Sequence, residues 1–389
     1  MNVPHHSLEG RFVVATPMRS VCDDNARALE QIGKLRFIAL GTRRGTRGIP
    51  SERTRLNPAI GLTAYAGSRV LPPFHAESFR FRLLPWFDRW VLKQLRPGDH
   101  IISSYGYVNE CFKFARASGG KTFLDAGNSH PENFWNTISE EHRRWNCSLP
   151  PVSPFWHERS MSILQDVDLV LSPSSFVTNS FLERGFKPEQ ILRNVYPVDL
   201  QLFHPRAEQR PKNRPLTIVS TASLSLRKGT PYLLEAFRIV QKEIPEARFL
   251  LTQLVEDSVK EIVRAYSDLN IEWSPPLPHS RLADRLRAAD LFVLPSLEEG
   301  LARTCIEALA CGLPIVVTPN TGANDWIDER SGEVVPVRDS AAIAAAILKW
   351  NEKVRDTSWE QRCLFDPTRF SFDHFAAEFV RQLKILELI

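Results

Sequence analysis

The sequence predicts an α/β protein made of two Rossmann-like, doubly wound domains that face a cleft. Its 389 residues are about 2.6 times the ~150 residues typical of one domain. Short apolar runs alternate with helical stretches along the whole chain, which is typical of parallel sheets covered by helices on both faces. A polar, proline-marked stretch, His204–Pro215, separates two such series. We therefore expect one doubly wound domain on each side of it.

The first half contains five apolar runs that we interpret as buried strands: Phe12–Ala15, Leu35–Leu40, His100–Ser103, Thr122–Leu124 and Leu169–Leu171. Helical patterns lie between them, for example at Asp23–Ile32, Asn109–Ser118 and Ser174–Arg184. The region Gly41–Pro73 is basic and rich in glycine and proline, so we expect it to be an irregular loop.

The second half shows the same alternation more regularly. Its predicted strands are Leu216–Thr221, Arg248–Gln253, Ile271–Ser274, Leu291–Pro295, Pro314–Thr318 and Gly332–Pro336. We expect domains at 1–204 and 205–369. The last segment, 370–389, has apolar residues at helical spacing and is a candidate to pack back on the first domain.

Composition excludes several classes of protein. The chain is 43% hydrophobic and 24% charged, as expected for a globular protein. No apolar run approaches the ~18 residues of a membrane span, and the polar N-terminus is unlike a secretory signal. Six scattered cysteines fit free thiols in a reducing cytoplasm. The net charge of +4 is too small for a general nucleic-acid binder, although residues 1–100 hold 16 Lys and Arg against 8 Asp and Glu.

The segment Leu291–Thr318 is the most informative for function. A predicted strand ends at Pro295, and a loop with Glu298, Glu299 and Gly300 opens a helix near Ala302–Thr304. That loop delivers the backbone amides after Gly300 to a helix N-terminus at the carboxyl edge of the sheet. Such a terminus is suited to an anion such as a phosphate.

Two glutamates in this segment, Glu299 and Glu307, are separated by seven residues. On a helix, eight steps would rise about 12 Å and rotate about 80° beyond two turns. This separation exceeds that of a glycosidase carboxylate pair, about 5–9.5 Å. Either the two glutamates grip different parts of one extended ligand, or both are solvated charges on a helix face.

The same segment resembles the signature of glycosyltransferase family 4, a group 1 glycosyltransferase family, in its Pro-Ser, Glu-Gly, Glu-to-Glu spacing and Glu-Ala-Leu-Ala-Cys-Gly-Leu-Pro run. The resemblance implies a GT-B fold and transfer of a sugar from a nucleotide-sugar donor with retention of configuration. It implies that Glu307 binds the ribose hydroxyls. It also implies that Glu299 faces the donor hexose, with the amides of Gly300 and Leu301 nearby.

A second matching motif, Ser220–Phe237, places Arg227 and Lys228 just before a predicted helix. Two cations there can neutralise a diphosphate and its leaving-group charge. Ser223 occupies the position where the family has an arginine, and Arg227 is a candidate replacement. The alternative is an ordinary surface Arg-Lys pair.

In the first half, Phe123–Trp135 contains His130 after a predicted strand. The resemblance implies that His130 contacts the donor sugar near its reacting carbon; the alternative is a structural loop residue. Asp125 and Asn128 are weaker candidates. We expect no metal and no cofactor, and we interpret Asp166 and Asp168 as a coincidental Asp-x-Asp pattern before a buried strand.

The helical stretch Phe79–Arg96 mixes cations with Phe, Trp and Leu. It fits either a helix of the domain core or one that lies on an anionic membrane. Together these observations predict a cytoplasmic retaining glycosyltransferase that takes a nucleotide-sugar donor and a glycan, lipid-linked or small-molecule acceptor. It could contact the inner face of the membrane through its basic first domain. The alternatives are a nucleotide-sugar epimerase, a phosphorylase, or a non-catalytic scaffold with this fold.

Overall fold

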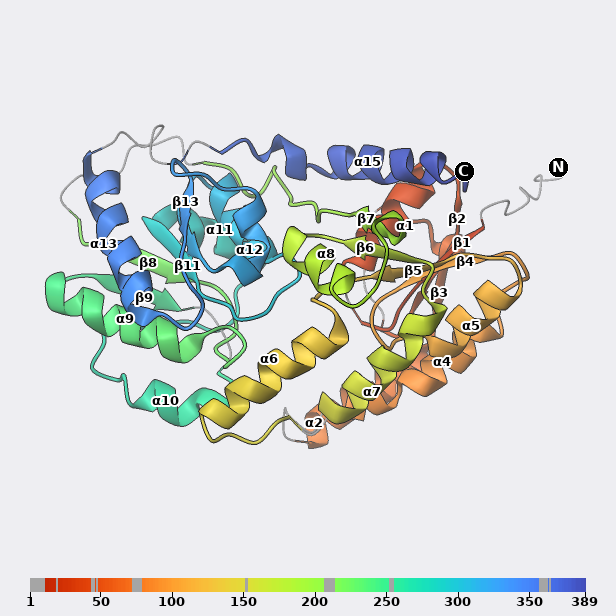
Figure 1. The fold of residues 1–389 in the computed structure, drawn as a ribbon, viewed down its shortest axis with the longest axis horizontal. Coiled ribbons are helices and arrows are strands. Elements are labelled where there is room, and N and C mark those ends of the chain that lie inside the picture. Colours follow the sequence, from red (N-terminus) through yellow and green to blue (C-terminus); the bar gives the residue numbers. More distant parts are fainter. Residues whose placement is uncertain are drawn as a thin grey trace.

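The computed structural model describes residues 11–18, 20–42, 46, 48–71, 79–150, 153–205, 214–251, 255–356, 363 and 365–389. It contains two parallel sheets, each flanked by helices, that form two Rossmann-like domains side by side (Figure 1). The predicted fold class is therefore confirmed. The core of the expected linker, residues 206–213, lies outside the described residues, as do Thr252 and Gln253 of one expected strand.

Within the described residues, the first sheet has seven strands in the order β3-β2-β1-β4-β5-β6-β7, and all neighbours are parallel. Its strands are β1 (Phe12–Thr16), β2 (Leu35–Leu40), β3 (Thr54–Leu56), β4 (His100–Ser103), β5 (Thr122–Asp125), β6 (Leu169–Ser172) and β7 (Ile191–Arg193). Its helices are α1 (Cys22–Gln31), α2 (Pro58–Val70), α4 (Leu84–Leu92), α5 (Asn109–Ala117), α6 (Pro131–Arg144), α7 (Ser153–Ile163) and α8 (Ser175–Leu182). The strand order reverses between β1 and β4, where doubly wound sheets bind ligands.

The described part of the second sheet has six strands in the order β10-β9-β8-β11-β12-β13, again all parallel. Its strands are β8 (Thr217–Ser220), β9 (Arg248–Leu251), β10 (Ile271–Trp273), β11 (Leu291–Leu294), β12 (Ile315–Val317) and β13 (Gly332–Val334). Its helices are α9 (Thr230–Glu243), α10 (Lys260–Arg264), α11 (His279–Ala288), α12 (Arg303–Ala310) and α13 (Ser340–Asp356). Its strands β8, β11 and β12 are fully buried, as apolar runs in parallel sheets require.

Helices α15 (Phe372–Ile385) and α6 each contact the other domain. The C-terminal helix α15 runs over the first domain, where Phe375, Phe379 and Leu383 pack into the same apolar cluster as strands β1 and β2 (Figure 1). Helix α6 belongs to the first domain, but the hydroxyl of Tyr232 in α9 donates to Glu141 near its C-terminal end. Both contacts fix one domain against the other.

We expected an irregular loop over Gly41–Pro73, and this expectation was wrong for residues 51–70. That part of the region contains strand β3 and the 13-residue helix α2. The side chain of Asn57 caps α2 by accepting from the backbone N–H of Ile60, and Pro58 occupies the first turn, where a missing N–H costs nothing. Glycines in α2 serve close packing, because a Cβ on Gly61 would lie 2.7 Å from the carbonyl oxygen of Gly41.

Candidate functional site

The loop after β11 lies at the contact between the domains. Its side chains Ser296, Glu298 and Glu299 are all buried. The hydroxyl of Ser296 donates to the Glu299 carboxylate at 3.0 Å, and its carbonyl accepts from Thr318 at the end of β12. Ser296, itself held by Thr318, therefore helps to fix the position of the Glu299 carboxylate.

A second loop, before α9, carries Arg227 and Lys228 to the same place. The backbone carbonyl of Arg227 accepts from the N–H of Leu297 at 2.8 Å, which ties this loop to the one after β11. Gly229 follows with φ of +70°, and a Cβ there would lie 2.1 Å from the carbonyl oxygen of Pro295. Only glycine combines this left-handed backbone with so close an approach. The turn at Gly229 thus sets where Lys228 points.

The three predicted residues Arg227, Lys228 and Glu299 form one ion cluster. Lys228 Nζ pairs with Glu299 Oε1, and Arg227 Nη1 lies 3.3 Å from Glu299 Oε2. Burial alone would raise the pKa of Glu299, but the two cations and the Ser296 hydroxyl offset it and lower that pKa to about 2. Arg227 keeps 28% of its side-chain surface exposed, so a ligand can still reach the guanidinium group.

Glu298 points the other way, toward the first domain. Its carboxylate accepts from the side-chain amide of Asn128 and from the backbone N–H of Ser129, both at 2.8 Å. Arg227 donates to its carbonyl oxygen at 2.8 Å. Adjacent glutamates of one loop therefore bind different domains: Glu299 binds the cations of the second domain, and Glu298 binds the loop after β5.

Gly300 and Leu301 continue this interdomain contact. A Cβ on Gly300 would lie 2.3 Å from the carbonyl oxygen of Gly127, and the Gly300 carbonyl accepts from the hydroxyl of Ser174 at 2.6 Å. Leu301 is buried in the apolar cluster around α12. Helix α12 begins at Arg303, as expected, and has no side-chain cap at Ala302.

Glu307 lies in the middle of α12 and is only 7% exposed. Within the described part of the chain, its carboxylate has neither a hydrogen bond nor an ion pair. Burial raises its pKa to about 7, against a smaller opposing effect of Arg303 one turn earlier. The structure does not bring Glu307 into contact with Glu299, in agreement with the long spacing between them.

His130 takes a different position from the cluster. Its Nδ1 accepts from the backbone N–H of Glu132 and so caps α6, and its ring packs edge-on against Phe181 at 5.1 Å between ring centroids. Burial, helped by Arg184, lowers the pKa of His130 to about 4, so the ring is neutral at pH 7. Among the described residues, no direct contact links this imidazole to Arg227, Lys228 or Glu299.

Asp125 and Asp168, the other acidic residues considered in the first half, both have structural partners. Asp125 lies inside the first domain, where it accepts from the side-chain amide of Asn25 at 2.7 Å, and burial raises its pKa to about 7. Asp168 accepts from the backbone and hydroxyl of Thr122, so it supports β5 structurally. In the described residues, no group of three or more His, Cys, Asp or Glu side chains could hold a metal ion.

Sequence reasoning missed the residues that hold the domains together. Asp325 accepts from the backbone and side chain of Ser175 and pairs with Arg193, and Arg303 pairs with Asp24. Each pair joins residues more than 100 positions apart. No local pattern in the sequence marks such partners, because each is an ordinary charged residue until the fold brings it opposite the other.

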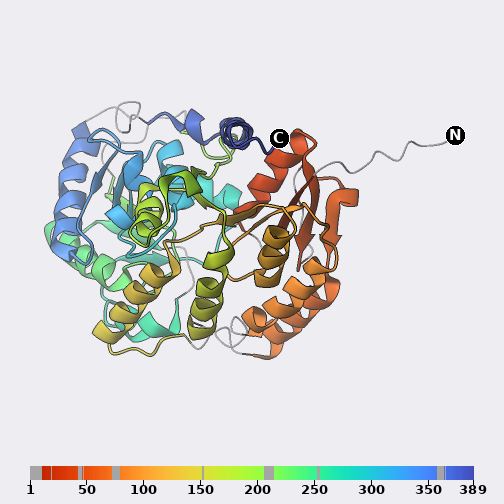
Figure 2. The same ribbon diagram turned by 45° about the vertical axis from the view of Figure 1, so that its right-hand side comes forward.

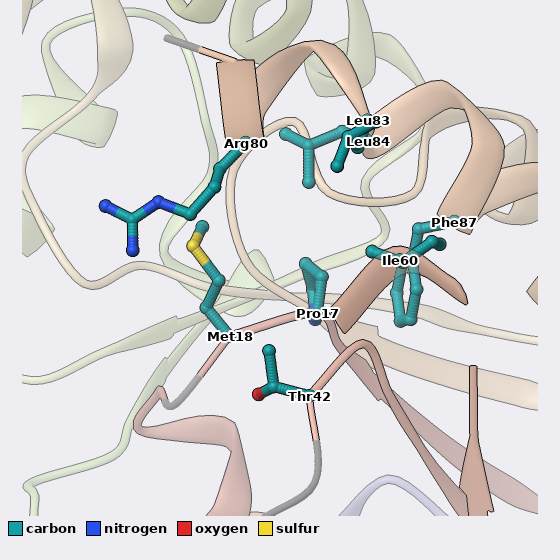
Figure 3. Close-up of a pocket in the computed structure, with 8 residues that line it drawn as sticks. All are labelled: Pro17, Met18, Thr42, Ile60, Arg80, Leu83, Leu84 and Phe87. Carbon is teal, nitrogen blue, oxygen red and sulfur yellow. The ribbon is translucent and has the colours of Figure 1, made fainter. Parts of the chain in front are cut away.

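A separate cavity of about 340 Å³ lies at the carboxyl ends of β1 and β2 in the first domain. Most of its lining is apolar and comes from Pro17 and Met18 after β1, Ile60 of α2 and Phe87 of α4. Figure 3 shows the Arg80 side chain extending past Met18, away from Ile60 and Phe87. Among the described residues that line it, the cavity thus combines an apolar wall with the cation of Arg80.

Comparison with known proteins agrees with this geometry. Residues 204–358 match the family model of glycosyl transferases group 1. Over 200 residues, the chain is 28% identical to the putative colanic acid biosynthesis glycosyltransferase WcaL of Salmonella typhimurium, covering 49% of each protein. Over 155 residues, it is 30% identical to the amylovoran biosynthesis glycosyltransferase AmsK of Erwinia amylovora, covering 37% of this chain and 38% of that protein. The chain therefore aligns with half or less of the length of these relatives.

Solved structures resemble the chain over almost its whole length. Sucrose-phosphate synthase from Thermosynechococcus elongatus matches with a TM-score of 0.69 and 20% identity, covering 97% of this chain and 99% of that one. Anabaena HepE, solved in complex with UDP and glucose, matches with a TM-score of 0.63 and 14% identity, covering 96% and 99%. At these identities the likeness establishes the fold. The chain has the two-domain GT-B fold, and its second domain carries the sequence pattern of the group 1 glycosyl transferases.

Proposed function

We propose that the protein is a retaining glycosyltransferase that moves a hexose-type sugar from a nucleotide-sugar donor to an acceptor hydroxyl in polysaccharide or glycoconjugate biosynthesis. One observation carries the proposal: Arg227 and Lys228 converge with Glu299 beside the start of α12, where the two domains meet. The match of residues 204–358 to group 1 glycosyl transferases supports it. So do the polysaccharide-biosynthesis names of the relatives.

In this proposal the donor lies along the second domain. Glu307 binds the ribose hydroxyls, for which a buried carboxylate without another partner in the described chain is well suited. Arg227 and Lys228 bind the diphosphate together with the amides of Gly300 and Leu301 and the uncapped first turn of α12. Glu299 faces the hexose and stays ionised, because its pKa is about 2.

The reaction breaks the bond between the anomeric carbon and the diphosphate oxygen and forms one between that carbon and the acceptor oxygen. The acceptor proton passes to the departing diphosphate on the same face. The two cations stabilise the negative charge that develops on the leaving group. Neither Glu299 nor Glu307 acts as a nucleophile. His130 contributes as a neutral group near the donor sugar, since its pKa of about 4 leaves it unprotonated at pH 7.

The acceptor approaches from the first domain. The cavity beside Pro17, Met18 and Arg80 lies at the carboxyl ends of β1 and β2, where ligands of parallel sheets bind. Its mostly apolar wall and the cation of Arg80 favour an acceptor with an apolar portion next to an anionic group. Replacing Arg80 should therefore raise the KM for the acceptor more than it changes the KM for the donor.

The first test is a thermal-shift screen with UDP, GDP, ADP and their sugar conjugates, without added metal. A ligand that binds the native state raises its stability. We expect one nucleotide to raise the Tm and Glu307→Ala to abolish the shift. Lys349→Ala, an exposed lysine of the same domain, is the matched control and should keep the shift.

Turnover with the selected donor then separates the alternatives. A transferase releases the nucleoside diphosphate and forms a new glycosidic bond only with an acceptor. An epimerase converts the donor without releasing nucleotide, and a phosphorylase requires inorganic phosphate. Binding without any turnover would favour a scaffold, and no Tm shift with any nucleotide would overturn the donor assignment.

A further inference from the structure

Arg303 is the first residue of helix α12, and its side chain reaches out of the second domain. Its guanidinium group pairs with the carboxylate of Asp24, in helix α1 of the first domain. It also lies 5.3 Å from the centroid of the Tyr196 ring, which is close enough for a cation–π contact. The Nε–H group of Arg303 is buried and has no acceptor among the described residues. The cation thus has a partner in the first domain and one donor that is not used.

Glu307 follows Arg303 by four residues on the same helix. Residues at this spacing share one face, and helical side chains lean toward the N-terminus, so the Glu307 side chain lies over the turn that contains Arg303. Burial raises the pKa of Glu307 to about 7, and the nearby charge of Arg303 opposes that rise. Opposite charges at this spacing normally pair, yet these two do not. Because Arg303 is drawn to Asp24, the carboxylate of Glu307 stays open to a ligand.

Asp24 is held where it can keep Arg303. It lies in the first turn of α1, where the helix dipole favours a negative charge, and it also pairs with Arg27 at 3.2 Å. The guanidinium group of Arg27 lies 3.7 Å from the centroid of the Phe372 ring, at the start of α15. Helices α1 and α15 lie side by side in both ribbon views (Figures 1 and 2). The position of the Asp24 carboxylate is therefore set by two helices.

Asp125, a second carboxylate of the first domain, also acts on Arg303 but is already bound. It accepts from the side-chain amide of Asn25 at 2.7 Å and from the hydroxyl of Tyr196 at 3.4 Å. Glu307 has no such donors in the described chain. If the charge of Asp24 is removed, the carboxylate that is left for Arg303 to pair with is that of Glu307.

We propose that Arg303 is a positioning residue through which Asp24 of the first domain keeps the Glu307 carboxylate free for the ribose of a nucleotide. This inference rests on the proposed binding of ribose by Glu307 and adds a condition to it. Held by Asp24, Arg303 leaves Glu307 to accept from the two ribose hydroxyls. Without the charge of Asp24, Arg303 pairs with Glu307 and competes with the ribose. Nucleotide binding by the second domain thus depends on a carboxylate of the first.

A ratio of two dissociation constants measures the contribution of the ribose hydroxyls. Calorimetric titration of the full chain at pH 8 compares the nucleoside diphosphate selected from UDP, GDP and ADP with its 2′,3′-dideoxy analogue. In the wild type, we expect the analogue to bind about 100-fold more weakly, because hydrogen bonds to a charged group are lost. Asp24→Asn should reduce this ratio about tenfold, since Arg303 then occupies Glu307 in most molecules. Asp24→Asn combined with Arg303→Gln should restore the ratio, because no cation competes.

Arg193→Gln is the matched control. Arg193 pairs with Asp325 across the domains, and 36% of its side-chain surface is exposed, as for Arg303. It also lies over an aromatic ring, that of Trp326, at 5.5 Å. Since Arg193 is not on α12, its loss should leave the ratio unchanged. An equal reduction in Asp24→Asn and Arg193→Gln would overturn the role of Arg303, and so would a double variant as impaired as Asp24→Asn.

Glu307→Ala separates this inference from the proposed function. If Glu307→Ala abolishes the difference between the two ligands while Asp24→Asn keeps the wild-type ratio, the ribose assignment stands and the role of Arg303 falls. If the wild type itself binds the two ligands equally, or binds none of the nucleotides, both fall. A general loss of stability weakens both ligands alike and cancels in the ratio.

Discussion

The carboxylate of Glu298 accepts a hydrogen bond of 2.8 Å from the side-chain amide of Asn128, across the contact between the two domains. The same carboxylate accepts from the backbone of Ser129, and its neighbour Glu299 binds Lys228. The adjacent residues Glu298 and Glu299 therefore connect the loop after β5 to the cations of the second domain. Through Asn128 and Ser129, Glu298 also fixes the backbone that leads into His130.

Exchanging the donor and the acceptor between Asn128 and Glu298 should preserve their hydrogen bond. Asn128→Asp alone places two carboxylates together and should destabilise the protein by about 2 kcal/mol or more. Adding Glu298→Gln restores complementarity, because the introduced amide donates to the introduced carboxylate while its oxygen still accepts from Ser129. We expect the double variant to recover most of the lost stability, measured by urea unfolding as a double-mutant cycle. Additive effects would show that the pair is not coupled in solution.

Close approach of the two domains at Gly300 gives a second prediction. A methyl group on Gly300 would lie 2.3 Å from the Gly127 carbonyl oxygen, whereas one on Gly127 would meet nothing within 4 Å. Gly300→Ala should therefore cost about 1–3 kcal/mol of stability and separate the domains, with a larger radius of gyration in X-ray scattering. Gly127→Ala, on the facing loop, is the matched control and should change neither. Equal behaviour of the two variants would mean that the domains do not meet this closely in solution.

The sequence predicts the fold well because buried parallel strands and their helices are encoded locally. It also places the start of α12 correctly, because Glu-Gly and the apolar run after it are local signals. It fails at α2, where glycines that allow close packing look the same as glycines that make a loop. The family resemblance assigns Arg227, Lys228 and Glu299 to one ligand, but it does not predict that they pair with one another. Nor does it predict the partners of Glu298, since Asn128 is 170 residues away.

Lys228 should be essential for turnover. Replacing it with Met removes a cation from the leaving-group site and should reduce kcat/KM by about 100-fold or more. Lys349→Met changes net charge equally at an exposed position of the same domain and should leave kcat/KM unchanged. Steady-state rates with donor and acceptor varied separately measure both. Unchanged turnover in Lys228→Met would remove the diphosphate from this cluster.

The opposite pKa shifts of Glu299 and Glu307 predict opposite effects of pH on stability. Burial raises the pKa of Glu307 to about 7, above the 4.5 expected for an unfolded chain. Its ionisation therefore opposes folding: the penalty is absent below pH 4.5, grows between pH 4.5 and 7, and is complete above. Glu307→Gln removes it and should stabilise the protein by up to about 3 kcal/mol at pH 8, with little effect at pH 4.5.

Glu299→Gln should behave in the reverse sense. Burial alone would raise the pKa of Glu299, but pairing with Lys228 and Arg227 outweighs burial and lowers that pKa to about 2. The ionised form of Glu299 therefore stabilises the fold above pH 4.5. That contribution is lost as the pH falls from 4.5 to 2. The substitution should thus destabilise the protein at pH 8, by up to about 3 kcal/mol, and progressively less below pH 4.5. Urea unfolding of both variants from pH 3 to 8 measures the two slopes. Slopes of the same sign would show that at least one of the two carboxylates has a different environment in solution, and the assignment of Glu307 to the ribose and Glu299 to the hexose would lose its electrostatic basis.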